Sequence, residues 1–526
     1  MNGEVSHMSP QSESSGESTA KFPICRKQSF WDRFRFHRSE RPDYDEAEIH
    51  TWNGDHDSEN PFNWSKTYKW ILTLTGCFMT VIVSLPTGSY SSGKIYMAKE
   101  FHVQDKPFPN LIWATFSFQL GAAFLPAICV PLSETWGRQP GYFVGYSILV
   151  ISLFPSAFAH NFATLIVTRF FGGGAAASTI NIVGGSISDV WRGSMARSHP
   201  MSVYIFSTTV GISLGPFIGG GLQRIHIGEP WRRIFYVQIM WGVALMPVFY
   251  FILYETRGDV ILSKRAKKLR LQTGRPIYSK FELEMPSLAR RLKVSTTRPT
   301  WMLLTEPVVF FFTLWLSFAW GILFVYFDSV YLTFHHNYKY DIFTVGLVEL
   351  AIMVGTFIGL AFDPIQAAIY RRSAKKNQDG ESYGKPMPEA RLYTSIPGSL
   401  LFAGGLFWYG WSSVGDGSVH WIVPTLGIGC TGVGIYTILI AVNNFLIDAY
   451  EKYAASALSA TSLGRNIVSA AVPLSSTALF THLGYGWAGS LLGFIGLALS
   501  LVPVVLVWKG PPIRRRSPFM KESTFD

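Results

Sequence analysis

Runs of about twenty uncharged, mostly apolar residues recur along this chain of 526 residues and limit the folds that it can adopt. Two of them, Ile234–Tyr254 and Trp487–Trp508, contain no charged residue. A helix of that length crosses the hydrocarbon layer of a bilayer, which is roughly 30 Å thick. Only 15% of the residues are charged, whereas globular proteins carry about 25%. We therefore expect an integral membrane protein.

Twelve such runs fall into two sets of six, separated by a charged stretch, residues 255–305, that is too polar to cross a membrane. This pattern predicts an all-α protein with six-helix bundles at 66–254 and 306–508. A disordered tail (1–65) precedes them and a short basic tail (509–526) follows. The expected spans are residues 68–90, 108–131, 141–159, 162–187, 200–222, 231–254, 307–333, 342–362, 392–413, 420–446, 454–480 and 486–508.

Lysine and arginine are distributed unevenly between the two sides of the membrane. They are concentrated in the tails, in 255–305 and in the connection near 363–391, whereas the expected outer connections hold few, Lys94 among them. Because cytosolic loops carry such an excess, we expect both termini in the cytosol. We expect the plasma membrane as the location, with the vacuolar membrane as the alternative. The same distribution explains the pI of 9.3 without nucleic acid as a partner.

The two sets of runs resemble each other at matching places. Asp189 closes the fourth run and Asp448 closes the tenth, and Pro216 and Pro473 lie in the fifth and the eleventh. Such matches indicate a duplication, with the halves related by pseudo-twofold symmetry. In duplicated transporters the binding site lies between the halves, near the middle of the membrane.

The stretch from Val130 to Pro140, VPLSETWGRQP, follows the second run. An acid at a helix end followed by Gly137 and an arginine makes a tight turn. Glu134 can face the positive end of a neighbouring helix, and Arg138 can hold a carboxylate or carbonyl oxygens. The stretch resembles the loop signature of the major facilitator superfamily, although Val130 replaces its first glycine and Glu134 its aspartate. An ordinary capped loop is the alternative.

The fourth run contains Arg169 followed by small residues up to Ser178. A charged residue within a membrane is costly, so Arg169 marks either a functional site or a structural ion pair. The segment resembles the fourth-span motif of the superfamily, in which the arginine is linked to proton coupling.

Glycines about four residues apart in the fifth run form a flat face, and its proline permits a bend. The stretch resembles the antiporter motif that is found in proton-coupled efflux members and is usually missing from uptake members. Gly355 and Gly359 in the eighth run offer a facing groove, and close packing without directional meaning is the alternative. The residues of the motif are Gly211, Gly215, Pro216, Gly219 and Gly220.

Further segments, among them Glu59–Trp64 (ENPFNW), Pro230–Gln238 (PWRRIFYVQ) and Asn444–Tyr450 (NFLIDAY), are similar to the fungal branch of the twelve-span drug:proton antiporters. The resemblance covers most of the chain after residue 50. It implies export of a small organic compound, such as a drug, toxin, polyamine or secondary metabolite, driven by protons through alternating access. Proton-coupled uptake of an organic nutrient or acid is the alternative. We expect a lipid-embedded monomer without enzymatic activity, cofactor or metal.

Two carboxylates lie within the expected spans, Asp328 in the seventh and Glu349 in the eighth. A carboxylate in a low-dielectric environment can exchange a proton near neutral pH, so either one is a candidate proton carrier. Arg169 and Arg465 are their candidate partners.

Aromatic and amide side chains in the spans could line a cavity for an amphipathic ligand, since ligand sites combine apolar walls with a few polar groups. For any single aromatic residue, core packing or lipid contact is the alternative. The candidates are Trp113, Phe116, Gln119, Gln238, Trp315, Trp320, Tyr326, Tyr436, Asn443 and Asn444.

The orientation can be tested at Asn63-Trp-Ser65, which is the one Asn-x-Ser/Thr sequence in the chain. Because N-glycans are added in the secretory lumen, we expect Asn63 to carry none in a eukaryotic host. Glycosidase treatment followed by gel electrophoresis checks this. A mass shift that the Asn63→Gln variant lacks would place the N-terminal tail on the outer side.

Overall fold

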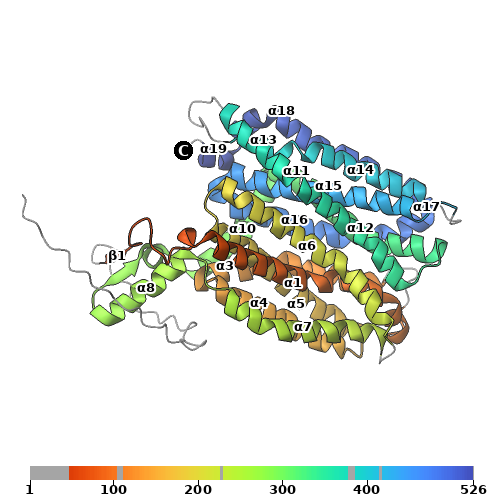
Figure 1. The fold of residues 1–526 in the computed structure, drawn as a ribbon, viewed down its shortest axis with the longest axis horizontal. Coiled ribbons are helices and arrows are strands. Elements are labelled where there is room, and N and C mark those ends of the chain that lie inside the picture. The colour runs from red at the N-terminus through yellow and green to blue at the C-terminus, as the bar shows by residue number, and fades with distance from the viewer. Residues whose placement is uncertain (1–46, 104–109, 226–228, 377–385, 414–417, 525–526) are drawn as a thin grey trace, which may run out of the picture. The chain divides into compact units, whose positions relative to one another are not determined.

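The computed structural model describes residues 47–103, 110–225, 229–376, 386–413 and 418–524, which are mostly helical (Figure 1). The helices before residue 255 are α1 (Lys66–Glu100), α2 (Trp113–Phe124), α3 (Pro126–Trp136), α4 (Arg138–Ala157), α5 (Phe162–Val190), α6 (Ser194–Gln223) and α7 (Pro230–Ile252). The connecting segment holds α8 (Gly258–Thr273), α9 (Lys280–Glu284) and α10 (Leu288–Thr305). The helices after it are α11 (Pro307–Tyr331), α12 (Ile342–Ala361), α13 (Asp363–Lys376), α14 (Ser395–Ser412), α15 (Ile422–Tyr450), α16 (Ala454–Ala471), α17 (Ser476–Leu499), α18 (Leu501–Arg516) and α19 (Pro518–Thr524).

Local sequence explains where several helices begin. The side chains of Ser65, Asn161 and Asp341 precede α1, α5 and α12, and each accepts a hydrogen bond from a backbone N–H in the first turn. These caps satisfy N–H groups that have no partner within the helix. Pro230 and Pro307 begin α7 and α11, at the position where a missing N–H costs least.

The two halves use the same order of helix packing. In the first half α1 packs on α6, α2 on α5, and α4 on both α5 and α7. In the second half the corresponding pairs are α11 with α16, α12 with α15, and α14 with α15 and α17. Between the halves, α6 contacts α12 and α2 contacts α16, so the interface repeats the same relation (Figure 1). This repetition agrees with the duplication indicated by the sequence.

The expected spans coincide with helices. Seven of the described helical stretches are long and apolar enough to cross a membrane, and the bent pair of α2 and α3 makes an eighth. One of the seven, Ile422–Arg516, contains α15 to α18. The expected break between the last two spans falls within α17, where Gly484 has φ +75° and interrupts the helical geometry. In the first span, α1 extends ten residues beyond the expected end at residue 90.

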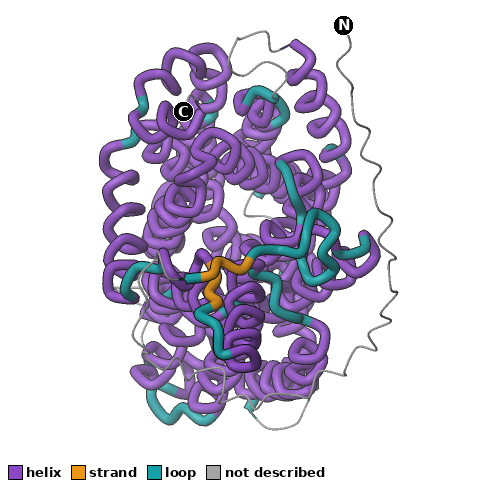
Figure 2. The backbone as a smooth tube through the Cα atoms, turned by 90° about the vertical axis from the view of Figure 1, so that its left-hand side faces the viewer, coloured by secondary structure: helices purple, strands orange, loops and turns teal. Residues whose placement is uncertain are grey.

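Residues 47–65 differ from the disordered tail that the sequence predicts, while residues 1–46 lie outside the described part of the chain. β1 (Glu48–His50) pairs in parallel with β2 (Ile277–Ser279) of the connecting segment, with Glu48 opposite Ile277. Figure 2 shows these strands in orange, over the ends of the helices. A three-residue strand is too short to be recognised from alternation, and its partner is far away in sequence. We call this end of the bundle the connector end, and the opposite end the far end.

Asp57 strengthens the attachment of this segment. Its carboxylate accepts hydrogen bonds from the backbone N–H groups of Asn53 and Glu59 and forms an ion pair with Arg265 at 2.7 Å. Burial alone would raise the pKa of the Asp57 carboxyl, but these bonds and the Arg265 charge hold the pKa below its usual value. The contact is therefore strongest when Asp57 is ionised, and it weakens as the pH falls through that lowered pKa.

Close helix packing in the second half can be tested at Gly434 of α15. A Cβ there would lie 2.7 Å from the Gly398 carbonyl oxygen and from the Phe402 Cα of α14. We expect Gly434→Leu to lower the free energy of unfolding by about 1–3 kcal/mol or more through overpacking. Apparent melting of the detergent-purified protein measures the effect. At Gly404 an added Cβ meets nothing within 4 Å, so Gly404→Leu is the control, and equal melting of both variants would contradict the packing.

Candidate functional site

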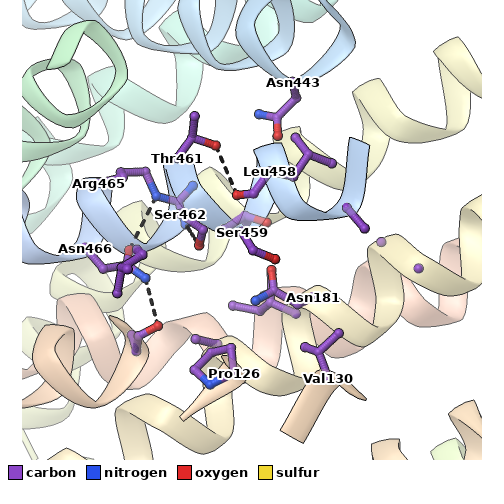
Figure 3. Close-up of a pocket in the computed structure, with 18 of the residues that line it drawn as sticks. Pro126, Val130, Asn181, Asn443, Leu458, Ser459, Thr461, Ser462, Arg465 and Asn466 are labelled. Atoms are coloured by element: carbon purple, nitrogen blue, oxygen red, sulfur yellow. Dashed lines mark hydrogen bonds between the residues drawn. The ribbon is translucent and has the colours of Figure 1, made fainter. Parts of the chain in front are cut away.

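A cavity of about 620 Å³ lies between the two halves (Figure 3). The first half contributes residues of α1 to α6, and the second half contributes residues of α11, α15 and α16. Helix α10 of the connecting segment also lines it. Apolar side chains of both halves form part of the wall, including those of Phe118, Ala176, Ile180, Leu316 and Leu439.

One face of α16 supplies polar groups to the cavity. Ser459, Ser462 and Asn466 are three and four residues apart, so they lie along one side of the helix, as Figure 3 shows. The Asn466 side chain donates a hydrogen bond of 2.8 Å to the Ala122 carbonyl oxygen, which ties α16 to α2 across the interface.

Arg465 is the charged residue of this helix face. Its Nη2 donates to Ser462 Oγ and its Nε donates to Asn466 Oδ1, both at 3.4 Å. The guanidinium carbon lies 4.8 Å from the centroid of the Trp320 ring, within the range of a cation–π contact. These hydrogen bonds are long, and the side chain is only partly buried because it borders the cavity.

The pairing of Arg465 that the sequence offers does not occur. Within the described residues, neither Asp328 nor Glu349 forms an ion pair with Arg465. The sequence alone does not indicate that Arg465 borders the cavity instead of pairing with an acidic residue.

Three of the ten candidate cavity residues line this cavity: Gln119 of α2, Trp320 of α11 and Asn443 of α15. Gln119 is 4% exposed, and its Nε2 has no hydrogen-bond partner among the described residues. The Asn443 side chain donates to the Leu439 carbonyl oxygen at 2.7 Å. Their roles in binding stay predictions.

Trp113 and Phe116 lie outside the cavity. They border an open apolar hollow formed by α2 and α5, and Trp113 is 37% exposed. This placement fits the alternative of lipid contact. Gln238 also lies elsewhere, since its side chain donates a 2.6 Å hydrogen bond to Ser89 Oγ of α1.

The remaining four candidates are buried in the second half. Trp315 and Tyr326 belong to its hydrophobic core, and the Tyr326 hydroxyl bonds Thr431 Oγ1 at 2.9 Å. Tyr436 donates to the Ser202 carbonyl oxygen at 3.4 Å, and Asn444 is buried on α15. Helix α11 is apolar on every side, and periodicity cannot separate the faces of such a helix.

At the far end, an ion pair links the halves. Lys94 Nζ of α1 lies 2.6 Å from Asp328 Oδ1 of α11, and Ser476 Oγ donates to Asp328 Oδ2 at 3.0 Å. The sequence places Lys94 in an outer loop, which is wrong because α1 continues to Glu100. The uncharged residues between 90 and 94 are the signal that could have extended the first span.

A small space lies beside this ion pair. About 10 Å³ in volume, it is bordered by Lys94, Asp328 and Thr87, and Thr87 also borders the cavity. Its size is close to the smallest space that holds a water molecule.

Glu349 of α12 is the second carboxylate of this region. It is 2% exposed, and its Oε2 has no hydrogen-bond partner among the described residues. Its charge interacts with those of Asp328 and Lys94. The structure therefore groups both proton-carrier candidates with a lysine that the sequence did not single out.

The contact between α6 and α12 also closes the far end. A Cβ on Gly220 would lie 2.9 Å from the Ile342 carbonyl oxygen, and one on Gly346 would lie 2.8 Å from the Pro216 carbonyl oxygen. Arg224 and Asp341 form an exposed ion pair of 2.6 Å beside this contact. Glycines thus allow the backbones of the two halves to meet.

The other glycines of the fifth-span motif face α1 rather than α12. A Cβ on Gly211 would lie 2.5 Å from the Val81 carbonyl oxygen, and Gly215 and Gly219 similarly meet Gly88 to Ser92. The facing groove expected at Gly355 and Gly359 belongs to a different contact, since both glycines pack on α15. Pro216 meets both helices, because its carbonyl oxygen accepts a 2.9 Å hydrogen bond from Ser92 Oγ of α1 and also faces Gly346 of α12.

Arg169 of α5 is buried without a carboxylate partner among the described residues. Its Nε donates to the Ala114 carbonyl oxygen at 2.9 Å, and its Nη1 donates to that of Pro86 at 3.3 Å. The guanidinium also lies over the rings of Tyr90 and Phe118. It therefore holds α1, α2 and α5 together behind Phe118, which borders the cavity.

At the connector end, Arg138 is the centre of a polar cluster. Its Nε donates to Asp189 Oδ2 at 2.9 Å, its backbone N–H donates to Glu255 Oε1 at 2.9 Å, and its Nη2 lies 3.9 Å from Glu134. Arg291 of α10 reaches the same Glu134 carboxylate at 3.7 Å. Glu134 thus lies between two arginines.

Gly137 makes this turn possible. Its φ of +109° is rarely adopted by other residues, and a Cβ there would collide with the Glu255 carboxylate. The tight turn expected after the second span is therefore present, although its effect on transport is untested.

The second half repeats the ion pair of Arg138 with Asp189. Arg391, just before α14, donates through Nε to Asp448 Oδ2 at 2.8 Å, and both pairs are at least partly buried. Duplication of Asp189 and Asp448 was visible in the sequence, whereas Arg391 was missed because it lies outside the loop signature. Within the part of the chain that the structure describes, no three acidic, histidine or cysteine side chains gather into a metal site.

Helix α6 also contacts the second half at the connector end. Ser202 Oγ donates to Asp363 Oδ1 at 2.8 Å, and Arg391 Nη1 donates to Ser198 Oγ at 2.9 Å. On the other side of the interface the cavity extends to this end, where its wall includes Glu134 and Asp189. The cavity therefore reaches the connector end and stops short of the far-end ion pair.

Residues 76–473 match the family profile described as the Major Facilitator Superfamily. The efflux pump atB of Aspergillus terreus is 36% identical to this chain over 399 residues, which cover 74% of this chain and 82% of that protein. The citrinin biosynthesis cluster MFS transporter mrr1 of Monascus ruber is 32% identical over 483 residues, covering 91% and 94%.

Among solved structures, the proton:xylose symporter XylE bound to 6-bromo-6-deoxy-D-glucose superposes with a TM-score of 0.57 at 16% identity. The match covers 85% of this chain and 96% of that structure. This similarity confirms the expected fold of two six-helix bundles. Since the family profile matches most of the chain and two relatives exceed 30% identity, the chain belongs to the Major Facilitator Superfamily.

Proposed function

We propose that this protein exports a small organic compound from a fungal cell by alternating access, in exchange for protons moving inward. The observation that supports this best is the cavity between the halves. It reaches the connector end, and at the far end Lys94 and Asp328 join the halves. A carrier that exposes one site to two sides in turn needs a seal on one side at a time.

The side assignment rests on charge. The connecting segment is rich in lysine and arginine, and such segments lie on the cytosolic side. In this proposal the cavity faces the cytosol, both termini are cytosolic, and the protein works as a monomer in the plasma membrane. Cargo would enter at the connector end, past Glu134 and Arg138.

The direction of transport is supported by the relatives. One is named an efflux pump and another a transporter of a biosynthesis cluster, both in fungi. The fifth-span glycines also resemble the motif of efflux members. A secondary metabolite is therefore the proposed cargo class, and uptake would use the same cavity with the opposite net flux.

Proton coupling is proposed from the far-end group. Protonating Asp328 removes its charge and with it the attraction to Lys94, so the ion pair and the proton compete for one carboxylate. In the cytosol-facing state the ion pair is formed at 2.6 Å, and the proton would leave through Thr87 and the cavity. In the outward state the helices separate, and Asp328 can take a proton from outside. Coupling follows because the two states differ in proton affinity.

Export predicts a cellular phenotype. Expression of this chain in a sensitive yeast should increase survival against at least one toxic secondary metabolite and lower its accumulation. We expect Gly346→Leu to abolish both effects, because a side chain at the α6–α12 contact keeps the far end from closing. Growth curves and intracellular compound levels are the measurements. Higher accumulation in expressing cells would instead establish uptake.

The Gly346 experiment has a matched control. Gly404→Leu makes the same exchange at an exposed position where an added Cβ meets nothing within 4 Å, and it should protect cells as well as the unaltered chain. Comparison is made at equal surface abundance. Full protection by Gly346→Leu would contradict the proposed role of far-end closure.

Coupling predicts a separation of two fluxes at Asp328. In proteoliposomes, Asp328→Asn should reduce gradient-driven transport to background, because the amide cannot carry a proton. Counterflow of labelled cargo should continue, since exchange needs no net proton movement. Lys94→Gln breaks the same ion pair and keeps the carboxylate, so gradient-driven transport should persist at a lower rate. Intact gradient-driven transport by Asp328→Asn would exclude Asp328 and leave Glu349 as the carrier.

A further inference from the structure

We propose that the cavity recognises an organic anion, an aromatic or otherwise apolar compound that bears a carboxylate, and that Arg465 binds this carboxylate. The inference rests on the proposed export function and narrows its cargo. It does not involve the far-end proton site.

The first argument is the state of Arg465. A guanidinium presents five N–H donors and pairs with carboxylates in a forked geometry. Here two donors make long bonds of 3.4 Å to the neutral side chains of Ser462 and Asn466. No carboxylate among the described residues pairs with it. Donor capacity therefore faces the cavity unused, in surroundings where an unpaired charge is costly.

The second argument is the distribution of charge along the cavity. Its acidic residues Glu134 and Asp189 lie at the connector end, where Arg138 and Arg291 pair with them. Glu451 is exposed. Arg465 is flanked instead by amide, hydroxyl and aromatic groups. A ligand in this part of the cavity meets one positive charge and no negative one from the described lining residues.

Arg169 adds to the positive potential. It lies behind Phe118 and bonds only carbonyl oxygens among the described residues. Arg169 of the first half and Arg465 of the second half thus both lack a carboxylate partner among the described residues. Such a field favours anions and repels cations, which argues against a polyamine as cargo.

The third argument concerns the rest of the ligand. The ring of Trp320 lies beside Arg465, and Phe118, Ile180 and Leu316 supply apolar wall. A cavity of about 620 Å³ is in the range that holds drug-sized molecules. One anionic group on an apolar body therefore matches the available partners.

Three fluorescent probes of one shape test the charge preference: pyrenebutyrate, pyrenebutanol and pyrenebutylamine. Binding to the purified full chain in nanodiscs is followed by quenching of tryptophan fluorescence. We expect pyrenebutyrate to bind roughly tenfold to a hundredfold more tightly than the alcohol, as a charge-assisted hydrogen bond implies. The amine should bind most weakly. Equal binding of acid and alcohol, or tighter binding of the amine, overturns the inference.

Variants assign the preference to Arg465. Arg465→Gln should remove the advantage of the acid over the alcohol and leave alcohol binding within about twofold, whereas Arg465→Lys should retain part of the advantage. Arg371→Gln removes the same charge from the exposed surface of α13 and should change nothing. Retention of the full advantage in Arg465→Gln overturns the assignment. Should Arg465→Gln not fold, the relative affinities of the three probes for the unaltered chain and for Arg465→Lys still test the assignment.

The outcome is separable from the export proposal. Cells that export neutral compounds while the purified chain shows no acid preference would keep the export proposal and overturn the carboxylate assignment alone. Failure of all three probes to bind also overturns the assignment. A clear acid preference in a chain that changes no cellular accumulation would keep the binding site and overturn export.

Discussion

Hydrocarbon offers no hydrogen-bond partners, and this constraint decides where nearly every polar group of the spans lies. Hydroxyl groups such as those of Thr80 and Ser178 return their hydrogen bonds to carbonyl oxygens one turn back in the same helix. Arg169 donates hydrogen bonds to carbonyl oxygens of two neighbouring helices. Against this background, the groups that lack such partners are conspicuous. Arg465 at the cavity makes only long hydrogen bonds to neutral side chains, and Glu349 Oε2 has no partner among the described residues, which is why both enter the proposals above.

The charges of the interface lie in three levels. The duplicated pairs of Arg138 with Asp189 and Arg391 with Asp448 lie at the connector end. Arg465 borders the cavity between the ends, and Lys94 with Asp328 lies at the far end. The two halves pack their helices in the same order, but the two sides of the interface between them differ in their polar contacts. On one side, α6 forms hydrogen bonds with the second half through Ser198 and Ser202. The corresponding side, between α2 and α16, holds the cavity.

The number and position of the spans could be predicted because each is an apolar run of membrane length, and even the kink at Gly484 falls in a predicted gap. Which face of each helix lines the cavity and which packs in the core could not be predicted. On α11 almost every side chain is apolar, so Trp315 in the core and Trp320 at the cavity look alike in sequence. Lys94 was assigned to a loop because charge was taken to end a span, whereas its partner Asp328 keeps it within the bundle. Pairings between distant segments, such as Arg391 with Asp448, need the fold itself.

The parallel pairing of β1 with β2 has a consequence for the order of events during synthesis. Glu48–His50 leaves the ribosome early, but its partner Ile277–Ser279 follows about 230 residues later. At roughly 5–20 residues per second, the first strand waits about 10–50 s, while all six helices of the first half are inserted. The strand can pair only once the connecting segment has emerged on the same side of the membrane. The pairing of β1 with β2 therefore cannot precede the synthesis of the first bundle.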